Sequence, residues 1–301
     1  MTEKTLPVSQ TPIETTRQKT FSRKKFWETT GLVVLQIIMT IWVITFLVPT
    51  IWMVSSSFKA STEVFAHPIV WIPEKPEWDN FSEVFEELPF DKFALNTFIV
   101  TGLAVLGTLV SSMLVAYSFA RLNWPGKNIF FSMLIATMML PDVVTLVPRF
   151  IMFRGFGWID TFLPLIVPFW TAISALYVFL AVQFLKGLPI ELEEAALIDG
   201  ASRLQIIIRI ILPLSKPVLA TIAVFALLQH YNDFMGPLIY LNSLQNWTLA
   251  LGVRGLNSSY ASNWEIIFAA STMMLAPVFL LFVFAQRFFV QGIAMTGFGG
   301  R

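Results

Sequence analysis

Six long apolar stretches divide this sequence, and they constrain its fold more than any other feature. Each one holds the roughly 20 helical residues needed to cross about 30 Å of hydrocarbon. Four of them contain no charged residue, whereas the third carries Asp142 and the fifth carries His230 and Asp233. The stretches occupy residues 31–54, 94–120, 128–148, 161–185, 217–241 and 266–286.

The composition agrees with a lipid environment. Of the 301 residues, 56% are hydrophobic and only 13% are charged, whereas a soluble domain carries about 25% charged residues. The apolar stretches do not alternate with a period of two residues, which favours helices over a porin-like barrel. The sequence therefore predicts an all-α polytopic membrane protein with six transmembrane helices.

Several functional classes receive no support from the sequence. The net charge is +1, and basic residues do not cluster with aromatic ones, so no nucleic acid is expected as a partner. The absence of cysteine excludes disulfides and thiolate metal sites. The two histidines, His67 and His230, share no motif with a nucleophile or a set of metal ligands, so no catalytic residue and no metal site is predicted.

The distribution of Lys and Arg predicts the orientation, because cationic loops remain cytoplasmic. With six spans, fourteen of these residues fall on the side of both termini and six on the other side. Both termini are therefore expected in the cytoplasm. The predicted parts are a largely disordered tail over residues 1–30, a membrane domain over 31–290, and a C-terminal tail over 291–301.

A charged stretch interrupts the apolar pattern between the fourth and fifth spans, where residues 193–214 read EEAALIDGASRLQIIIRIILPL. Pro189 and the acids after it suit the first turn of a helix. Gly200 ends that helix, and Ser202 is an N-cap for the next one. The connection 186–216 is thus predicted as two short cytoplasmic helices around a glycine corner. A single apolar stripe is expected on the second helix: Leu204, Ile207, Ile208 and Ile211.

This stretch contains a spaced signature: Glu194-Ala195-Ala196, three residues, Gly200, nine residues, Ile210, one residue, then Leu212-Pro213. It resembles the EAA motif of ATP-binding-cassette (ABC) importer permeases. The resemblance extends to YSFARLNWPGKNIFF at 117–131, LPLSKPVLA at 212–220 and YNDFMGPLIYL at 231–241, which are similar to the carbohydrate-uptake family of maltose and glycerol-phosphate permeases.

The resemblance implies a type-I ABC importer transmembrane domain of the MetI-like fold. The chain would then form half of the translocation pathway of a binding-protein-dependent carbohydrate importer, most similar to the six-span second maltose permease subunit. The implied partners are a second permease subunit in a heterodimer, two copies of a cytoplasmic ABC ATPase, an extracytoplasmic solute-binding protein and a carbohydrate, in a bacterial or archaeal cytoplasmic membrane.

In this family the EAA loop docks onto the ATPase, which gives a set of expected coupling residues. The alternative is an ordinary interfacial helix pair that only closes the loop. The expected coupling residues are Glu193, Glu194, Ala195, Ala196, Asp199, Gly200, Ile210, Leu212 and Pro213.

No segment of the sequence can itself hydrolyse ATP. A phosphate-binding loop needs G-x-x-x-x-G-K-[ST], but Gly126-Lys127 is followed by Asn128, and Arg121 stands where the first glycine should be. The chain is therefore predicted to be a transport subunit and not an enzyme. It would bind no cofactor directly, and ATP-Mg would lie on the partner ATPase. The alternative is an ion-gradient-driven secondary transporter, which usually shows intramembrane ionisable residues and paired repeats.

Polar residues within the spans are candidates for the transport pathway, because polar groups facing lipid are costly. The fifth span carries a cluster of them, and Asp142 lies in the third span between Pro141 and Pro148. Two alternatives are that Asn232 and Asp233 cap a helix that kinks before Pro237, and that Asp142 serves structure or gating. The cluster of the fifth span begins with Gln229, and its pathway candidates are His230, Tyr231, Asn232 and Asp233.

The outer loop 55–93 contains eight acidic residues and three lysines. By resemblance, this loop faces the solute-binding protein. An acidic, solvated cap anchored by interfacial tryptophans explains the same composition. The two interpretations are compatible, since an outer cap is where a delivery protein would dock.

Overall fold

The computed structural model describes residues 23–259 and 263–297, and within these ranges it contains helices and no strands. The chain divides into two compact units, residues 1–52 and 53–301. The first unit is the greater part of helix α1 (Arg23–Ser56), whose residues 30–51 are all exposed. The helix begins inside the tail that was predicted as disordered over 1–30; residues 1–22 of that tail lie outside the described part.

The described helices provide four to six membrane spans. Four are long and apolar enough to cross a bilayer: Thr30–Ser56, Phe90–Arg121, Leu163–Lys186 and Trp264–Phe284. Two further spans arise if each of two bent helix pairs counts as one. The prediction of an all-helical membrane protein is therefore confirmed, and the predicted number of six spans is reached when each bent pair counts as one.

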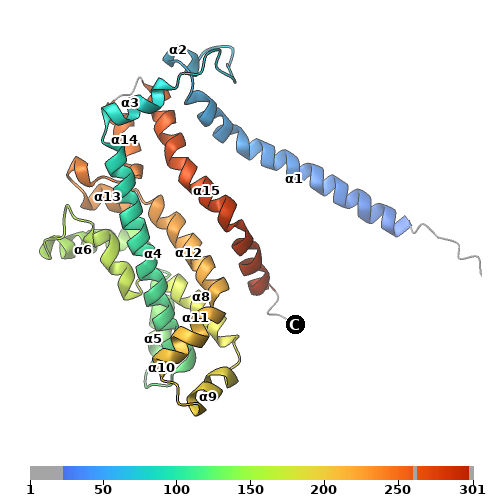
Figure 1. The fold of residues 1–301 in the computed structure, drawn as a ribbon, viewed down its shortest axis with the longest axis vertical. Coiled ribbons are helices and arrows are strands. Elements are labelled where there is room, and N and C mark those ends of the chain that lie inside the picture. The colour runs from blue at the N-terminus through green and yellow to red at the C-terminus, as the bar shows by residue number, and fades with distance from the viewer. Residues whose placement is uncertain (1–22, 260–262, 298–301) are drawn as a thin grey trace, which may run out of the picture. The chain divides into compact units, whose positions relative to one another are not determined.

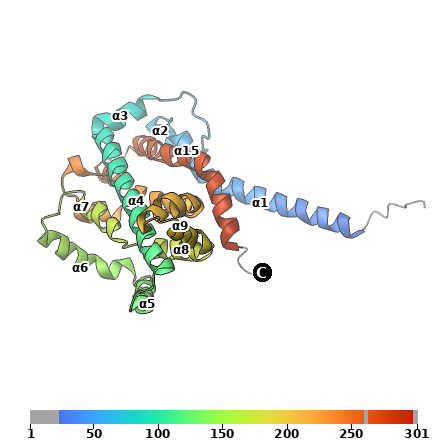
Figure 2. The ribbon, with the colours of Figure 1, turned by 60° about the horizontal axis from the view of Figure 1, so that its bottom comes forward.

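Helix α4 (Phe90–Arg121) lies at the centre of the second unit (Figures 1 and 2). It packs against α8 (Ala175–Lys186), α12 (Lys216–Tyr231) and the 3-10 helix η1 (Val167–Thr171). Small residues make this close packing possible. A Cβ at Gly107 would lie 2.4 Å from the indole of Trp170, so only glycine fits there. The core around α4, α8 and α12 contains Tyr117, Val178, Ala181, Ile206, Ile211 and Ile222.

The third span is not the continuous helix predicted over 128–148. It consists of α5 (Lys127–Thr137) and α6 (Asp142–Gly155), which meet at 102°. The break has a local cause, because Pro141 has no N–H to donate and favours an extended conformation, with ψ of 136°. The apolar composition correctly indicated a membrane segment, but it did not indicate the bend.

The fourth and fifth spans are also interrupted. The fourth consists of α7 (Leu163–Ile166), η1 and α8, with Ala172 in the left-handed region at φ +56°. The fifth was predicted as one helix over 217–241, but α12 ends at Tyr231 and a short helix α13 (Met235–Tyr240) follows. The prediction of an outer end that kinks before Pro237 thus agrees with the structure.

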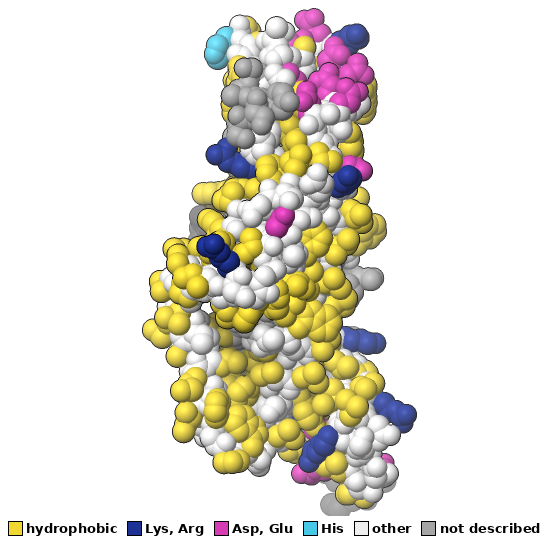
Figure 3. All heavy atoms as spheres, turned by 90° about the vertical axis from the view of Figure 1, so that its left-hand side faces the viewer, with side chains coloured by type: hydrophobic (Ala, Val, Ile, Leu, Met, Phe, Trp, Pro, Cys, Tyr) yellow, Lys and Arg dark blue, Asp and Glu magenta, His cyan; other side chains and the backbone are white. Residues whose placement is uncertain are grey.

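The outer loop forms two short helices, α2 (Ser61–Val64) and α3 (Asp79–Glu87). The buried amide of Asn80 holds the loop by donating to the carbonyl oxygens of Ser57 and Lys59 at 3.0 and 2.9 Å. Helix α3 packs on α15 (Trp264–Gly297), which continues well beyond the predicted sixth span and into the predicted C-terminal tail. Figure 3 shows acidic side chains gathered at the end of the molecule where α3 lies, above a broad hydrophobic surface.

The connection after α13 leads through the 3-10 helix η3 (Leu244–Asn246) to α14 (Leu249–Ser259). Its backbone is fastened to α4. The amide of Asn96 donates to the carbonyl oxygens of Gln245 and Trp247 at 2.8 and 2.9 Å. The backbone N–H of Leu249 donates to the hydroxyl of Thr97 at 2.8 Å. These bonds satisfy backbone groups where the helical ladder is broken.

Asp160 joins this connection to the loop that follows α6. Its Oδ1 accepts hydrogen bonds from the backbone N–H groups of Asn242 and Ser243, both at 2.9 Å. The Ser243 hydroxyl donates to Oδ2, and the Asn246 amide donates to Oδ1 at 3.2 Å and to the carbonyl oxygen of Asp160 at 2.8 Å. These donors, the Ser243 hydroxyl first, lower the pKa of Asp160 to about 2. In the folded protein, the Asp160 side chain is therefore ionised at neutral pH.

We predict that Asp160→Asn lowers the thermal unfolding midpoint at pH 7 and that the difference disappears in acid. The carboxamide would turn an NH₂ group toward one of the present donors. Since the folded pKa of about 2 lies below the ordinary value of ~3.9, the carboxylate stabilises the fold fully above about pH 4. This contribution is lost as the pH falls toward 2. Melting curves in detergent from pH 7 to acid measure it, and a difference that stays constant with pH would contradict the assignment.

Candidate coupling loop and pathway residues

The connection between α8 and α12 begins with α9 (Glu191–Ile198), which ends in a Schellman motif. The N–H of Ala201 donates to the carbonyl oxygen of Ala196 at 2.9 Å, and the N–H of Gly200 donates to that of Leu197 at 3.0 Å. Gly200 has φ +80°, a conformation that side chains with a Cβ rarely adopt. The glycine corner predicted from the sequence is present, and it fixes the direction in which the chain leaves α9.

The second helical segment starts at the predicted N-cap. Ser202 and Gln205 form a reciprocal capping box, with the N–H of Gln205 donating to the Ser202 hydroxyl at 3.3 Å and the N–H of Ser202 donating to Gln205 Oε1 at 2.7 Å. Helix α10 (Arg203–Ile206) then continues into the π-helix η2 (Ile207–Ile211) and α11 (Leu212–Leu214).

The predicted apolar stripe on this segment is correct only for Ile207 and Ile211, which pack in the core. Leu204 and Ile208 are 61% and 54% exposed, whereas the buried residues are Ile206 and Ile211. These two are five positions apart, and the π-helix brings residues at this spacing onto one face. The segment then bends by 77° into α12, with Pro213 in the first turn of α11 and Ser215 buried at the bend. Of the predicted motif residues, Leu212 packs against the core and Ile210 is partly buried.

Glu193 holds α9 to the end of α4. Its carboxylate is almost fully buried, with Oε1 2.7 Å from Nε of Arg121. The hydroxyl of Tyr117 donates to Oε2 at 2.9 Å, and Nη2 of Arg121 donates to the carbonyl oxygen of Leu188 at 2.7 Å. Glu193 was predicted among residues that couple to a partner, but it faces inward and cannot offer its carboxylate to another protein. Sequence reasoning also missed Tyr117 and Arg121, although both lie in the quoted segment YSFARLNWPGKNIFF.

The remaining motif residues of α9 divide between two faces. Ala196 is partly buried and packs against the core. Glu194, Ala195, Asp199 and Gly200 are exposed together. Beside them lies Ile198, whose side chain is 86% exposed. The loop therefore presents small, acidic and apolar side chains on one side, while the opposite side is bonded to α4.

The pathway candidates of the fifth span do not converge on one cavity. Tyr231 is buried, and its hydroxyl donates to the carbonyl oxygen of Met274 in α15 at 2.8 Å. The ring of His230 is also buried and meets Phe169 edge-on at 4.1 Å. The neighbouring Gln229 accepts a hydrogen bond from the hydroxyl of Tyr177 at 2.8 Å. These contacts connect α12 to α15, η1 and α8.

Asn232 and Asp233 lie at the break between α12 and α13. The exposed Asn232 donates its amide to the carbonyl oxygen of Leu228 at 2.9 Å. Oδ1 of Asp233 accepts from the N–H of Gly236 at 3.1 Å. Both side chains thus satisfy backbone groups at helix ends, which is the geometry expected from the capping interpretation.

Asp142 starts α6, directly after the bend in the third span. Its side chain is 97% exposed, and Oδ1 lies 3.0 Å from Nη2 of Arg149. Arg149 also donates through Nε to the hydroxyl of Thr145 at 3.0 Å. An exposed ion pair in a segment of membrane composition requires water or another protein beside it, because lipid solvates charge poorly.

Comparison with known proteins identifies the family. Residues 109–295 match the model of the binding-protein-dependent transport system inner membrane component. The arabinooligosaccharides transport system permease protein AraQ of Halalkalibacterium halodurans is 34% identical over 256 residues, covering 84% of this chain and 91% of that protein. The sulfoquinovosyl glycerol transport system permease protein SmoH of Agrobacterium fabrum is 30% identical, covering 84% of this chain and 89% of that protein.

A solved structure shows the same fold. It is the crystal structure of a bacterial ABC transporter involved in the import of the acidic polysaccharide alginate, with a TM-score of 0.78 and 22% identity over 89% of this chain and 99% of that chain. The fold and the family model define an ABC importer permease. The chain belongs to the family of binding-protein-dependent transport system inner membrane components, which confirms the resemblance found in the sequence.

We predict that Glu193→Ala destabilises the protein by about 3–5 kcal/mol, because the Arg121 guanidinium would stay buried without its carboxylate. Glu191→Ala is the matched control, since Glu191 is exposed on the same helix, and it should change stability by less than about 0.5 kcal/mol. Thermal unfolding in detergent measures the difference, together with limited proteolysis of the connection 186–216. Equal stability of the two variants would show that the pair does not hold the loop.

Proposed function

We propose that this chain is the permease subunit of an ATP-driven, binding-protein-dependent importer of carbohydrate, with an oligosaccharide as substrate. The single observation that carries the coupling role is the two-sided geometry of α9. One side is anchored to α4 through Glu193, and the other exposes Glu194, Ala195 and Ile198. This exposed side, held in place by the ion pair, supports contact with another protein over a loop that only closes the chain.

The relatives support the choice of substrate class. The names of two of them specify arabinooligosaccharides and sulfoquinovosyl glycerol. A third, the sn-glycerol-3-phosphate transport system permease protein UgpE of Yersinia enterocolitica, is 30% identical over 77% of this chain. Carbohydrates and their glycerol derivatives each carry several hydroxyl groups. We propose that the substrate of this chain is likewise a compound rich in hydroxyl groups.

The partners follow from the same assignment. A second structure of the same fold, with a TM-score of 0.64, is described as an alginate transporter in complex with an alginate pentasaccharide-bound periplasmic protein. We propose that this chain likewise works with an extracytoplasmic solute-binding protein, a second permease subunit and two copies of an ABC ATPase. The ATPase would bind ATP-Mg and supply the energy. The positive-inside distribution of Lys and Arg supports cytoplasmic termini.

For the pathway, we propose that Asn232 and Asp142 border the route of the substrate. Both side chains are exposed, which leaves them accessible from a space between two permease subunits. His230 and Tyr231 instead pack inside the helix bundle. They would stabilise the helices that line the pathway without contacting the substrate. Asp233 would hold the break after α12 in place.

We predict that Gly200→Val uncouples transport from ATP hydrolysis without preventing membrane insertion. A Cβ at Gly200 would meet nothing within 4 Å, so the substitution acts through backbone strain at φ +80°, on the order of 1–2 kcal/mol or more. Gly157 is a matched control, because it has φ +70° and equally free space but lies between α6 and α7. Substrate-stimulated ATP hydrolysis in reconstituted membranes should be lost in Gly200→Val and kept in Gly157→Val. Equal effects would remove the special role of the corner.

We predict that Glu194→Lys prevents the ATPase from co-purifying with the permease, because it reverses the charge offered to a basic partner surface. Glu191→Lys makes the same charge change at an exposed position on the same helix. It should retain most of the ATPase. The measurement is recovery of the ATPase on the tagged permease at low and high salt. Wild-type recovery with Glu194→Lys would exclude this face as the docking site.

A further inference from the structure

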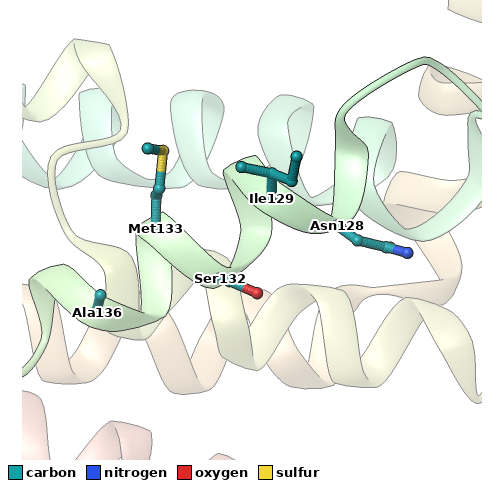
Figure 4. Close-up of a pocket in the computed structure, with 5 residues that line it drawn as sticks. All are labelled: Asn128, Ile129, Ser132, Met133 and Ala136. Atoms are coloured by element: carbon teal, nitrogen blue, oxygen red, sulfur yellow. The ribbon is translucent and has the colours of Figure 1, made fainter.

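The charged side chains of the third span lie mostly after its bend. From Asn128 to Thr137, α5 contains no charged residue. A hollow of about 470 Å³ beside this helix is lined by uncharged side chains (Figure 4). Helix α6, in contrast, carries charges from its first turn to its last. The residues that line the hollow are Asn128, Ile129, Ser132, Met133 and Ala136, and the charged residues of α6 are Asp142, Arg149 and Arg154.

Three polar residues, Asp142, Thr145 and Arg149, lie on one face of α6, at positions i, i+3 and i+7. They are called here the α6 polar stripe. The Thr145 hydroxyl donates to the carbonyl oxygen of Asp142 at 3.0 Å and accepts from Nε of Arg149 at 3.0 Å. Nη2 of Arg149 lies 3.0 Å from Oδ1 of Asp142. Thr145 thus holds the guanidinium toward the carboxylate, and the three side chains form one connected unit.

The stripe begins at the surface and leads to the core. The side chain of Asp142 is 97% exposed and that of Arg149 is 35% exposed. One turn further, Phe153 is buried and meets the ring of Tyr240 in α13 edge-on at 5.4 Å. The charge of Arg149 and the carboxyl group of Asp233 both act on the Tyr240 hydroxyl. Arg149 therefore lies between the exposed start of α6 and the break between α12 and α13, where other pathway candidates lie.

The side of α6 next to the stripe is apolar. Val143 and Val147, four residues apart, are 77% and 60% exposed. Figures 1 and 2 show α6 at the edge of the second unit, so these valines are open to contact with lipid or another subunit. Apolar side chains suit such surroundings, whereas an exposed ion pair is costly against lipid. The two sides of α6 therefore favour different neighbours, and the polar stripe suits water.

The ion pair keeps hydrogen-bonding capacity for a ligand. Nη1 of Arg149 and Oδ2 of Asp142 form no hydrogen bond within residues 23–259 and 263–297. Nη1 has two N–H groups to donate, and a carboxylate oxygen can only accept. Two adjacent hydroxyl groups of a sugar ring match this pair, because one can accept from Nη1 while the other donates to Oδ2. Both bonds would be charge-assisted and therefore strong.

The ion pair also selects a ligand by its charge. Asp142 cancels the charge of Arg149, and its exposed carboxylate would repel a phosphate, sulfonate or uronate group. We propose that Asp142 and Arg149 form a subsite for two adjacent hydroxyl groups of an uncharged saccharide. This subsite rests on the importer function proposed above and narrows its substrate to uncharged oligosaccharides.

Labelling of introduced cysteines tests whether the stripe faces water. The chain contains no cysteine, so each substitution supplies the one thiol on this subunit. Asp142→Cys in the complete reconstituted transporter should react with charged methanethiosulfonate reagents added to both sides of the membrane. Val143→Cys, one residue away on the apolar side, should react only after denaturation in detergent.

Uptake into the same vesicles tests the choice of substrate. The probe is an equimolar mixture of uncharged trisaccharides (arabinotriose, xylotriose and maltotriose) and uronate trisaccharides (trigalacturonate and trimannuronate), with the imported sugars measured by mass spectrometry. The wild type should prefer the uncharged sugars. Asp142→Asn, which leaves Arg149 without its counter-charge, should lower the ratio of uncharged to uronate uptake by at least about tenfold, the effect of one hydrogen bond to a charged group.

Arg154→Gln is the control, because it makes a charge change of the same size on the same helix, and it should leave the uptake ratio unchanged. The binding protein is the same in every sample, so a shift in the ratio reports a change in the permease.

Three results would overturn the subsite. An unreactive Asp142→Cys would show that lipid or protein covers the ion pair. An unchanged uptake ratio in Asp142→Asn, even with lower total uptake, would leave the pair with a structural role alone. A wild-type preference for uronates would contradict the charge selection. Import of no saccharide by the wild type would instead overturn the proposed function, and the subsite with it, while the labelling would still show whether the stripe faces water.

Discussion

The buried ion pair between Arg121 and Glu193 holds the segment between α8 and α12 to α4, the helix around which the larger unit of this protein is built. Arg121 is the last residue of α4, and α4 packs along α8 and α12. Burying both charges is costly, and the cost is offset only because the carboxylate and the guanidinium each have further partners. The Tyr117 hydroxyl and the Leu188 carbonyl oxygen supply them. The position of α9 is therefore determined by the end of α4 and not by the loop sequence alone.

A second constraint is that the backbone within a membrane must be bonded internally. The helices of these spans are broken at several points, and nearby side chains form hydrogen bonds with the backbone groups that the breaks leave free. Asn232 and Asp233 bond the backbone between α12 and α13, while Asn96 and Thr97 bond the connection that follows. The breaks divide the bundle into rigid segments joined at defined points.

Much of this architecture was predictable from the sequence, because apolar run length directly reports membrane spans. The corner at Gly200 and the cap at Ser202 were equally predictable from the sequence, since each depends on the chemistry of one residue. The bend after α5 was not, because Pro141 indicates a break but not its angle. The π-helix was missed because the run IIIRII fits spacings of four and of five residues equally well. The opposite roles of Glu193 and Glu194 could not be separated either, since only the contact with Arg121 distinguishes two adjacent acids.

This difference between adjacent acids bears on how a force would pass through the molecule under the proposed function. A partner that pushed on the exposed side of α9 would act on two connections at once. One is the ion pair to α4, which is short and buried. The other is the covalent path through Gly200, the capping box and the π-helix to α12, which is stiffened by hydrogen bonds at each turn. Because α4 and α12 also pack directly against each other, movement of α9 would displace them together. The motif thus needs residues that face inward as well as outward, and a docking surface alone would not transmit motion to the spans.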